Sequence, residues 1–322
     1  MIESSRSFAI THTRQVNRRE LVLALTVLAV KAAHASRSDR VLVLYPDRPD
    51  PERALFRSLI DNFSTALGTH GLTPVEHALS TSTPVDEIAS LIADQQPLAI
   101  VALGSVAIGL AQQARSNIPI LVGAAEVPVP TSGLAGISLI VDPHHVFSTL
   151  TDIAPTINAV SLVLQAERYG WLRPHIEQAA RDQSLQLSVF PAQTIGEAAA
   201  QYLTVLRGSN PKLDSLWLLN QPEFLTPDTL PRLIEEAWAR GIVVFSSVLE
   251  HVNEGALFAH YLSPAGTGRR LSQLLLNATQ HPGPIILDDV PARAVNLRTA
   301  RHLAGVVDLR KTAEFDLVLG TS

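Results

Sequence analysis

Ser105 stands where residue types and spacing come closest to a chemical motif, in the stretch "ALGSVAIGL". A serine nucleophile on a strand-to-helix turn requires G-x-S-x-G, followed by an acid and a histidine, and the flanking glycines are missing here. The stretch also lacks the lysine of a phosphate loop and the spacing of a dinucleotide-binding loop. Two interpretations remain for Ser105: a helix cap alone, or a cap that also presents its hydroxyl and the free helix N–H groups to a carboxylate or similar small group.

The other polar clusters do not form a recognisable site. The stretch Ser263–Arg270 resembles a phosphate loop, yet no lysine follows its last glycine, so we expect a loop that enters a helix. His144 and His145 follow a proline at an expected helix start, which favours solvated side chains over metal ligands. His251 and His260 have no cysteine or carboxylate at metal-ligand spacing.

Acidic and thiol chemistry is equally sparse. Asp288 and Asp289 are adjacent in an expected strand, so their side chains would point to opposite faces and not share a site. The chain has no cysteine, which excludes disulfides, thiolate metal sites and a cysteine nucleophile. We therefore expect a protein that is not an enzyme, with no catalytic residue, no metal and no cofactor. A hydrolase stays an alternative only if a histidine lies within reach of Ser105.

Alternating strands and helices must position these residues. Short β-branched and leucine-rich runs alternate with segments that carry apolar side chains at helical spacing. The predicted strands are 40–46, 72–79, 98–104, 118–124, 133–141, 159–166, 185–192, 215–219, 241–247 and 283–289. The predicted helices are 51–67, 85–94, 105–116, 145–153, 172–183, 195–207, 225–240 and 268–279. Because the rhythm restarts at Pro143, the fold class is α/β with two doubly wound parallel-sheet lobes.

The length and composition are consistent with two lobes, and the charge pattern argues against a nucleic-acid partner. A length of 322 residues suggests two domains, and 46% hydrophobic residues with 5% aromatics suffice for cores of Leu, Val, Ile and Ala. The net charge is −5, and no basic stripe with interleaved aromatics occurs, so we expect no nucleic-acid partner.

The first 35 residues read as an export signal. Arg14, Arg18 and Arg19 precede the apolar run 21–30, and Ala33-His34-Ala35 offers a cleavage site. The run is too short to span a bilayer comfortably, and a buried first helix is the competing interpretation. The arginine pair also resembles a twin-arginine signal. We expect a periplasmic chain that does not span the membrane after signal removal and acts as a monomer.

Several stretches together resemble one family. These are "VALGSVAIGLAQQARSNIPILVGAAEVP", "GLAGISLIVDP", "AWARGIVVFSSVLEHVNEGALFAHYLSPAGTGRRLSQLLLNATQHPGPI" and "VNLRTARHLAG". They are similar to the solute-binding component of an ABC transporter group that includes binders of the tryptophan/tyrosine type. The resemblance implies the type I periplasmic-binding-protein fold with a three-crossover hinge. It implies an N-terminal lobe of 36–141 plus about 248–288, and a C-terminal lobe of 142–247 plus about 289–322.

In that fold the strand ends of both lobes meet at a cleft, which suggests the ligand-binding residues. The candidates are Tyr45, Gly104, Ser105, Gly123, Ala124, Ala166, Asn220, Gln221, Ser246 and Ser247. Ser105 and the amides of its helix would hold a carboxylate, and Tyr45 and Tyr169 could stack on a flat solute. The family often has an Asp where Gln221 stands, and the loss of that charge weakens the case for an amino acid.

The resemblance therefore implies a periplasmic protein that captures a small polar or aromatic solute for an ABC permease. The alternative is a periplasmic sensor that signals to a membrane receptor or histidine kinase. Both alternatives require the same cleft, so the sequence leaves the choice open.

Overall fold

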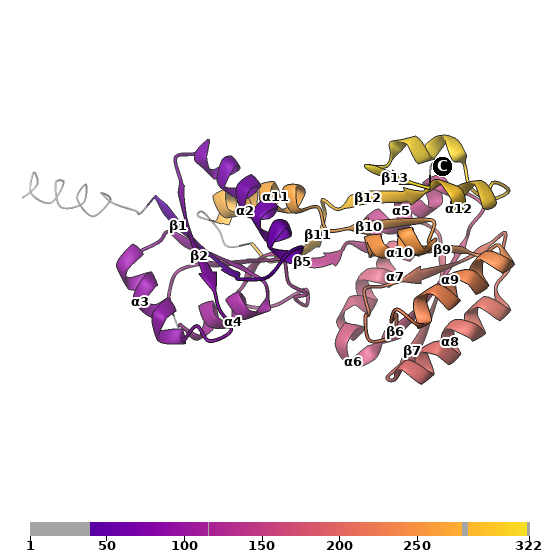
Figure 1. The fold of residues 1–322 in the computed structure, drawn as a ribbon, viewed down its shortest axis with the longest axis horizontal. Helices are drawn as coiled ribbons and strands as arrows, with labels where there is room; N and C mark the ends of the chain where they lie inside the picture. The colour runs from indigo at the N-terminus through magenta and orange to yellow at the C-terminus, as the bar shows by residue number, and fades with distance from the viewer. Residues whose placement is uncertain (1–38, 115, 279–282, 321–322) are drawn as a thin grey trace, which may run out of the picture. The chain divides into compact units, whose positions relative to one another are not determined.

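The computed structural model describes residues 39–114, 116–278 and 283–320 (Figure 1). The segment interpreted as an export signal, residues 1–35, lies outside this part of the chain. No helix in the described part is both long and apolar enough to cross a membrane.

The first lobe is built on a six-stranded sheet in the order β11-β5-β4-β3-β1-β2, with parallel pairing throughout. Its strands are β1 (Arg40–Pro46), β2 (Thr73–Leu79), β3 (Ala99–Leu103), β4 (Ile120–Gly123), β5 (Ala135–Val141) and β11 (Ile285–Asp288). Its helices are α2 (Glu52–Gly68), α3 (Val85–Gln95), α4 (Ser105–Gln113) and α11 (Pro264–Ala278).

Alternation along β1 shows how this sheet is buried on both faces. Val41 and Val43 pack in the cluster that contains α2 and α11, whereas Leu42 and Leu44 pack in the cluster that contains α3 and α4. Neighbouring strand residues point to opposite faces, so a strand with helices on both sides must be apolar at every position. This is the reason that "VLVL" is continuously apolar.

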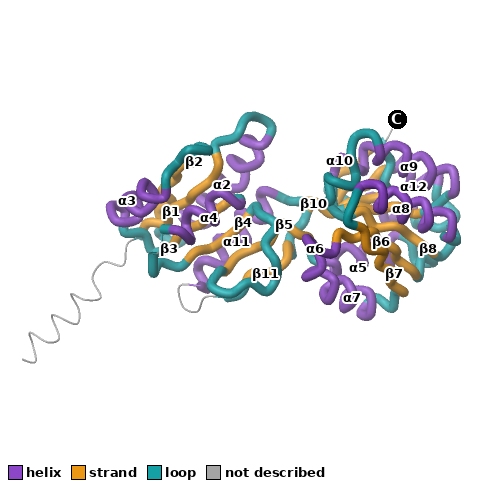
Figure 2. Tube along the Cα trace, turned by 90° about the horizontal axis from the view of Figure 1, so that it is seen from below, coloured by secondary structure: helices purple, strands orange, loops and turns teal. Residues whose placement is uncertain are grey.

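The second lobe is built on a seven-stranded sheet in the order β13-β12-β10-β9-β8-β6-β7. Its strands are β6 (Ala159–Gln165), β7 (Gln186–Ala192), β8 (Asp214–Leu218), β9 (Val243–Ser246), β10 (Phe258–Tyr261), β12 (Ala292–Asn296) and β13 (Leu317–Leu319). Its helices are α5 (Pro143–Ile153), α6 (Ala166–Tyr169), α7 (Arg173–Asp182), α8 (Ile195–Gly208), α9 (Thr229–Arg240), α10 (Leu249–Glu254) and α12 (Leu297–His302), with 3-10 turns at Gly170–Leu172 and Leu309–Glu314. Helices cover this sheet as well (Figure 2). Pairing is parallel except between β10 and β12.

The chain passes between the two sheets three times, as expected for a three-crossover hinge. The crossings follow β5 at Asp142, follow β10 at Leu262, and follow β11 at Asp289. They contact one another, because the Asp142 N–H donates to the Asp288 carbonyl at 3.0 Å. A Cβ on Gly266 would lie 2.9 Å from the Val290 carbonyl oxygen.

The predicted return to the first lobe near residue 248 is wrong. Residues 249–261 form α10 and β10, and β10 pairs with β9 and β12 in the second sheet. The return therefore follows Tyr261. The predicted return lies too early because the Gly-rich stretch 263–270 was interpreted as a loop that enters a helix.

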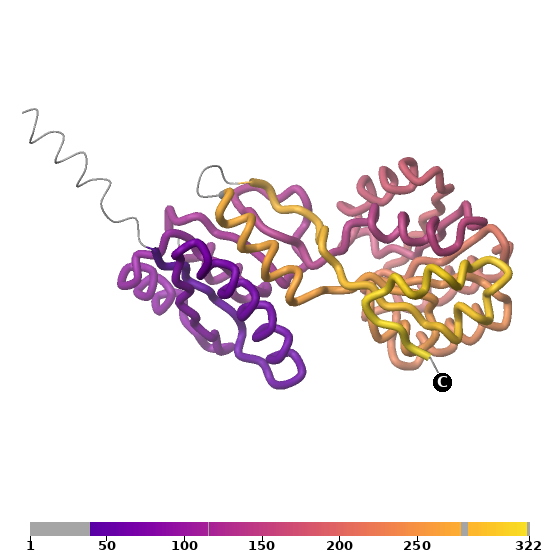
Figure 3. Tube along the Cα trace, turned by 90° about the horizontal axis from the view of Figure 1, so that it is seen from above, coloured from indigo at the N-terminus to yellow at the C-terminus, as the bar shows by residue number. Residues whose placement is uncertain are grey.

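That stretch is instead the first half of α11. A Cβ on Gly268 would lie 2.4 Å from the Leu59 carbonyl oxygen of α2, so only glycine allows the two helices to pack this closely. Figure 3 shows α11, in orange, beside α2, in indigo. The glycine serves helix packing, which outweighs its poor helix propensity. The predicted helix 225–240 also begins later, at Thr229, because a turn joins Thr226 to Thr229.

Candidate functional site

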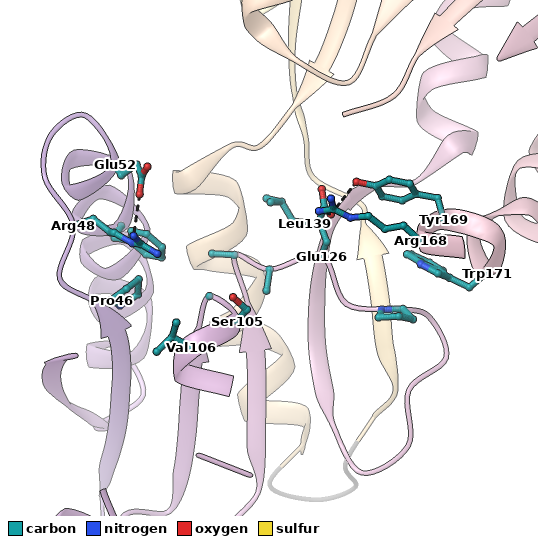
Figure 4. A pocket seen from close by; sticks show the side chains of 15 residues that line it. Pro46, Arg48, Glu52, Ser105, Val106, Glu126, Leu139, Arg168, Tyr169 and Trp171 are labelled. Carbon is teal, nitrogen blue, oxygen red and sulfur yellow. Dashed lines mark hydrogen bonds and ion pairs between the residues drawn. The ribbon is translucent and has the colours of Figure 1, made fainter. Parts of the chain in front are cut away.

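A cavity of about 500 Å³, the first cavity, lies at the carboxyl ends of β1, β3 and β4 (Figure 4). Ligands of parallel sheets bind at this edge. The first lobe contributes Pro46, Arg48, Glu52, Phe56, Gly104, Ser105, Val106, Ala124, Ala125, Glu126, Pro128 and Leu139, and the second lobe contributes Arg168, Tyr169 and Trp171.

The β3–α4 turn forms one wall of this cavity. The N-cap of α4 is Gly104, with φ 84° and ψ 157°, and no side chain caps the helix. Ser105 is the first helical residue, so the prediction that its side chain caps α4 is wrong. Ser105 is exposed, and its hydroxyl has no hydrogen-bond partner within the described residues. The N–H groups of the first turn likewise have no intrahelical partner, so this wall offers several free donors.

Glu126 forms a second polar wall. It follows β4, and its side chain is 18% exposed. Its Oε2 accepts from Arg168 Nη2 at 2.7 Å and from the Tyr169 hydroxyl at 3.1 Å, and its Oε1 lies 3.4 Å from Asn220 Nδ2. Burial raises the pKa of Tyr169, and the negative charge of Glu126 raises it further, so the phenol stays protonated. Arg168 also pairs with Glu223.

The remaining wall of the first cavity combines a charge pair with apolar surface. Arg48 Nε and Glu52 Oε2 lie 3.6 Å apart, and both side chains are about half exposed. Phe56, Trp171 and Leu139 supply aromatic and aliphatic surface. The cavity therefore has a donor-rich end at α4, an acidic side chain at Glu126 and apolar walls between them.

A second cavity of about 520 Å³ shares Leu139 with the first. It lies at the carboxyl ends of β8, β9 and β10 and is mainly apolar. Its polar lining includes Asn220, Ser247 and Glu250. Because Asn220 also contacts Glu126, the two cavities adjoin at this residue.

The structure brings together five of the ten predicted ligand-binding residues in these cavities. Gly104, Ser105 and Ala124 line the first, and Asn220 and Ser247 line the second. Neither cavity is lined by Tyr45, Gly123, Ala166, Gln221 or Ser246.

Three of these five residues have structural reasons for their absence. Tyr45 packs against the core cluster beneath α2. Gly123 is buried, and a Cβ there would lie 2.8 Å from Leu271. Ala166 is the first residue of α6, whose later residues face the first cavity instead.

Gln221 and Ser246 are bonded to the backbone of their own lobe. Gln221 is 1% exposed, donates from Nε2 to the Val163 carbonyl at 2.8 Å, and accepts at Oε1 from the Gln165 N–H at 2.9 Å. Ser246 is fully buried, and its Oγ contacts the Leu218 carbonyl and accepts from the Val248 N–H. Both side chains hold strand ends together and line neither cavity, and their contact with a ligand stays a prediction.

Nucleophile chemistry finds no support in the described residues. No histidine forms a hydrogen bond with Ser105 there. Ser246 Oγ does lie 2.7 Å from His251 Nδ1, but the serine is fully buried. Burial lowers the pKa of His251 to about 4. No group of three or more His, Cys, Asp or Glu in the described part could hold a metal ion.

Sequence reasoning missed Arg48, Glu126, Arg168 and Trp171. Glu126 lies three residues beyond β4, and Arg168 lies three residues beyond β6. Distance from the strand end does not explain the omission, because the predicted residue Gln221 also lies three residues beyond its strand, β8. The short helix α6 was also not predicted, although the run "ERYGW" is the signal that marks it.

Comparisons with known proteins bear on the fold. No family model and no curated protein matches the chain. A ligand-free, open substrate-binding protein with adhesive properties from Clostridium difficile is similar, with TM-score 0.63 and 16% identity over 87% of this chain and 99% of that one. A periplasmic ribose ABC transporter structure from Conexibacter woesei gives TM-score 0.52 and 10% identity over 85% and 93%. An ABC domain in complex with L-Trp from Streptococcus pneumonia gives TM-score 0.50 and 10% identity over 87% and 100%.

The chain has the type I periplasmic-binding-protein fold. The predicted fold class, two parallel-dominated α/β lobes, is thus confirmed. At these identities the likeness concerns the fold alone. Both cavities described above lie at strand carboxyl ends.

Proposed function

We propose that this protein is an exported, non-enzymatic solute-binding protein that captures a small polar or aromatic solute in the adjoining cavities and presents it to an ABC permease. One observation carries the proposal: the unpartnered Ser105 hydroxyl and the free N–H groups of α4 face a cavity that residues of both lobes line. The neighbours described as a substrate-binding protein and a ribose transporter support the same class.

The solute is bound by three kinds of contact. Its anionic or acceptor group bonds to the N–H groups of α4 and to Ser105, where the helix dipole favours negative charge. Its apolar part packs against Phe56, Trp171 and Leu139. Its remaining polar group lies toward Glu126. A tryptophan- or tyrosine-type solute has all three features.

Thermal denaturation of the full chain with single candidate solutes tests the proposal. A ligand that binds only the folded state raises the free energy of unfolding by RT ln(1 + [L]/Kd). The denaturation midpoint rises with it. We expect amino acids, nucleobases or small organic acids to include a stabilising solute, and native mass spectrometry to reveal any that co-purifies. Absence of stabilisation across all three classes contradicts the proposal.

Substitution of Ser105 locates the binding site. Ser105→Ala should weaken binding of the identified solute, while Ser188→Ala, an exposed serine on β7 that lines neither cavity, should leave it unchanged. Reconstitution with a permease then separates transport from signalling. Stimulation of a sensor kinase instead of uptake would replace the transport role with the sensory one.

A further inference from the structure

We propose that Glu126 is an exchangeable clasp between the two lobes, and that a hydrogen-bond donor of the solute takes the place of the second-lobe donors when it binds. The inference rests on the proposed function in one respect, that the first cavity receives a solute. The clasp itself is a property of the solute-free protein.

Three hydrogen-bond donors of the second lobe contact the Glu126 carboxylate. In this cluster the first lobe supplies one acceptor, the Glu126 carboxylate, and the second lobe supplies the donors Arg168, Tyr169 and Asn220. A separate contact joins the lobes at His175 Nε2, which lies 3.1 Å from the Val129 carbonyl oxygen. These donors come from the ends of two strands, β6 and β8. A single first-lobe side chain thus fixes two strand ends of the second lobe.

Two of the three second-lobe donors, Arg168 and Tyr169, have a second partner besides Glu126. Arg168 pairs with Glu223 as well. The Tyr169 hydroxyl also lies 3.0 Å from the Asn220 carbonyl oxygen, and its single proton can serve either acceptor. When the clasp opens, these two groups therefore keep a partner within their own lobe.

Glu126 is the group that loses its partners. Its side chain is only 18% exposed, and a largely buried carboxylate without a donor is unfavourable. It lines the first cavity, so a solute donor can reach it there. Among the described residues, the contact of Oε1 is the one at 3.4 Å to Asn220, so this oxygen has lone pairs to offer.

Charge favours the same exchange. Glu126, Arg168 and Glu223 together carry a net charge of −1, because one guanidinium serves two carboxylates. A cationic group of the solute compensates that charge, and a neutral N–H group supplies a hydrogen-bond donor to it. A solute that offers only acceptors leaves Glu126 without a donor, so the clasp selects solutes by their donors.

The decisive experiment measures the two lobes without a solute. Because the chain has no cysteine, Ser90→Cys on α3 and Thr204→Cys on α8, both exposed, provide one spin label in each lobe. Pulsed electron resonance then gives the distance distribution for the parent, for Glu126→Gln and for Glu223→Gln. Glu223→Gln is the matched control, because it removes the partner of Arg168 within the second lobe.

We expect Glu126→Gln to broaden or shift the distribution and Glu223→Gln to leave it unchanged. The parent at about 1 M salt should change in the same direction as Glu126→Gln but by less, because salt screens a partly buried ion pair less than an exposed one. This measurement needs no substitution at the clasp, so it holds even where Glu126→Gln does not fold. Unchanged distributions for both Glu126→Gln and high salt overturn the clasp.

A matched ligand pair tests the exchange. L-phenylalanine and 3-phenylpropanoate share a ring and a carboxylate, and only the first carries an amine. We expect the parent to favour phenylalanine by about tenfold, as for a charge-assisted hydrogen bond, and Glu126→Gln to lose most of that preference. Equal preference in parent and variant refutes the exchange. If neither probe binds, this proposed solute class fails, while the distance measurement still decides the clasp.

Discussion

In the first lobe, Ser105 follows β3 with an unpartnered hydroxyl, whereas in the second lobe Gln221 and Ser246, at the ends of β8 and β9, are bonded to backbone groups. All three are polar residues at the carboxyl ends of parallel strands, where ligands are expected. The difference teaches that position alone does not make a binding residue. A polar side chain at a strand end is available to a ligand only when it is not already hydrogen-bonded to backbone groups.

The largest expected change in stability comes from removing the backbone hydrogen bonds of Gln221 in the second lobe. Gln221→Leu leaves the Val163 carbonyl and the Gln165 N–H without their partner and should destabilise the fold by about 3 kcal/mol. Urea denaturation measures the loss. Gln112→Leu, an exposed position on α4, is the control and should change stability little. A loss at Gln221 no greater than at Gln112 would show that its amide is dispensable.

Substitution of Asp288, which lies where the crossings meet, should stabilise the protein, whereas substitution of Gln221 should destabilise it. Asp288 is fully buried, its Oδ2 has no partner among the described residues, and burial raises its pKa to about 7. Between pH 4 and 7 the unfolded chain releases this proton and the native protein keeps it, so stability from this group falls as pH rises. Asp288→Asn keeps an acceptor for the Val290 N–H and should stabilise the protein by about 2 kcal/mol at pH 9.

The same substitution should change little at pH 4, where both side chains are neutral. Denaturation midpoints at the two pH values provide the measurement. A gain that is equal at both pH values would point to packing rather than to charge.

His251, the partner of Ser246, gives a pH dependence of the reverse direction. Burial lowers its pKa to about 4, so below pH 6.5 the unfolded chain takes up a proton that the native protein refuses. Its contribution to stability should fall by about 2 kcal/mol between pH 6.5 and pH 5. His251→Asn can retain the contact with Ser246 and should flatten this part of the stability curve. His260 has a pKa lowered to about 3, mainly by burial, and its contribution to the pH dependence of stability remains in the variant.

The smallest effect on stability is expected at Ser105 itself. Because Ser105 does not cap α4, Ser105→Ala should change stability by less than about 0.5 kcal/mol. The adjacent Gly104→Ala forces a side chain to adopt φ 84° and should cost about 2 kcal/mol. Thermal denaturation of the two variants compares them. A loss of about 1 kcal/mol for Ser105→Ala would restore the capping role.

Local pattern sufficed for most of the fold. The apolar run 41–44, followed by a helix with apolar spacing, predicted a strand of a parallel sheet, and the restart at Pro143 predicted a second lobe. It failed at Ser263–Arg270, where glycine density suggested a loop. There the close approach of α11 to α2 makes glycine necessary inside a helix.

The sequence by itself determined the alternation of strands and helices, and with it the sheet edge at which Ser105 stands. Periodicity and turn residues are local properties, so they are readable from one chain. Only the tertiary structure decided which polar groups at that edge are free. Gln221 bonds to a carbonyl 58 residues away, and Glu126 meets Arg168 42 residues on, because partners of this kind depend on strand order and register. Those long-range bonds remove Gln221 from the candidate site and add Glu126 to it.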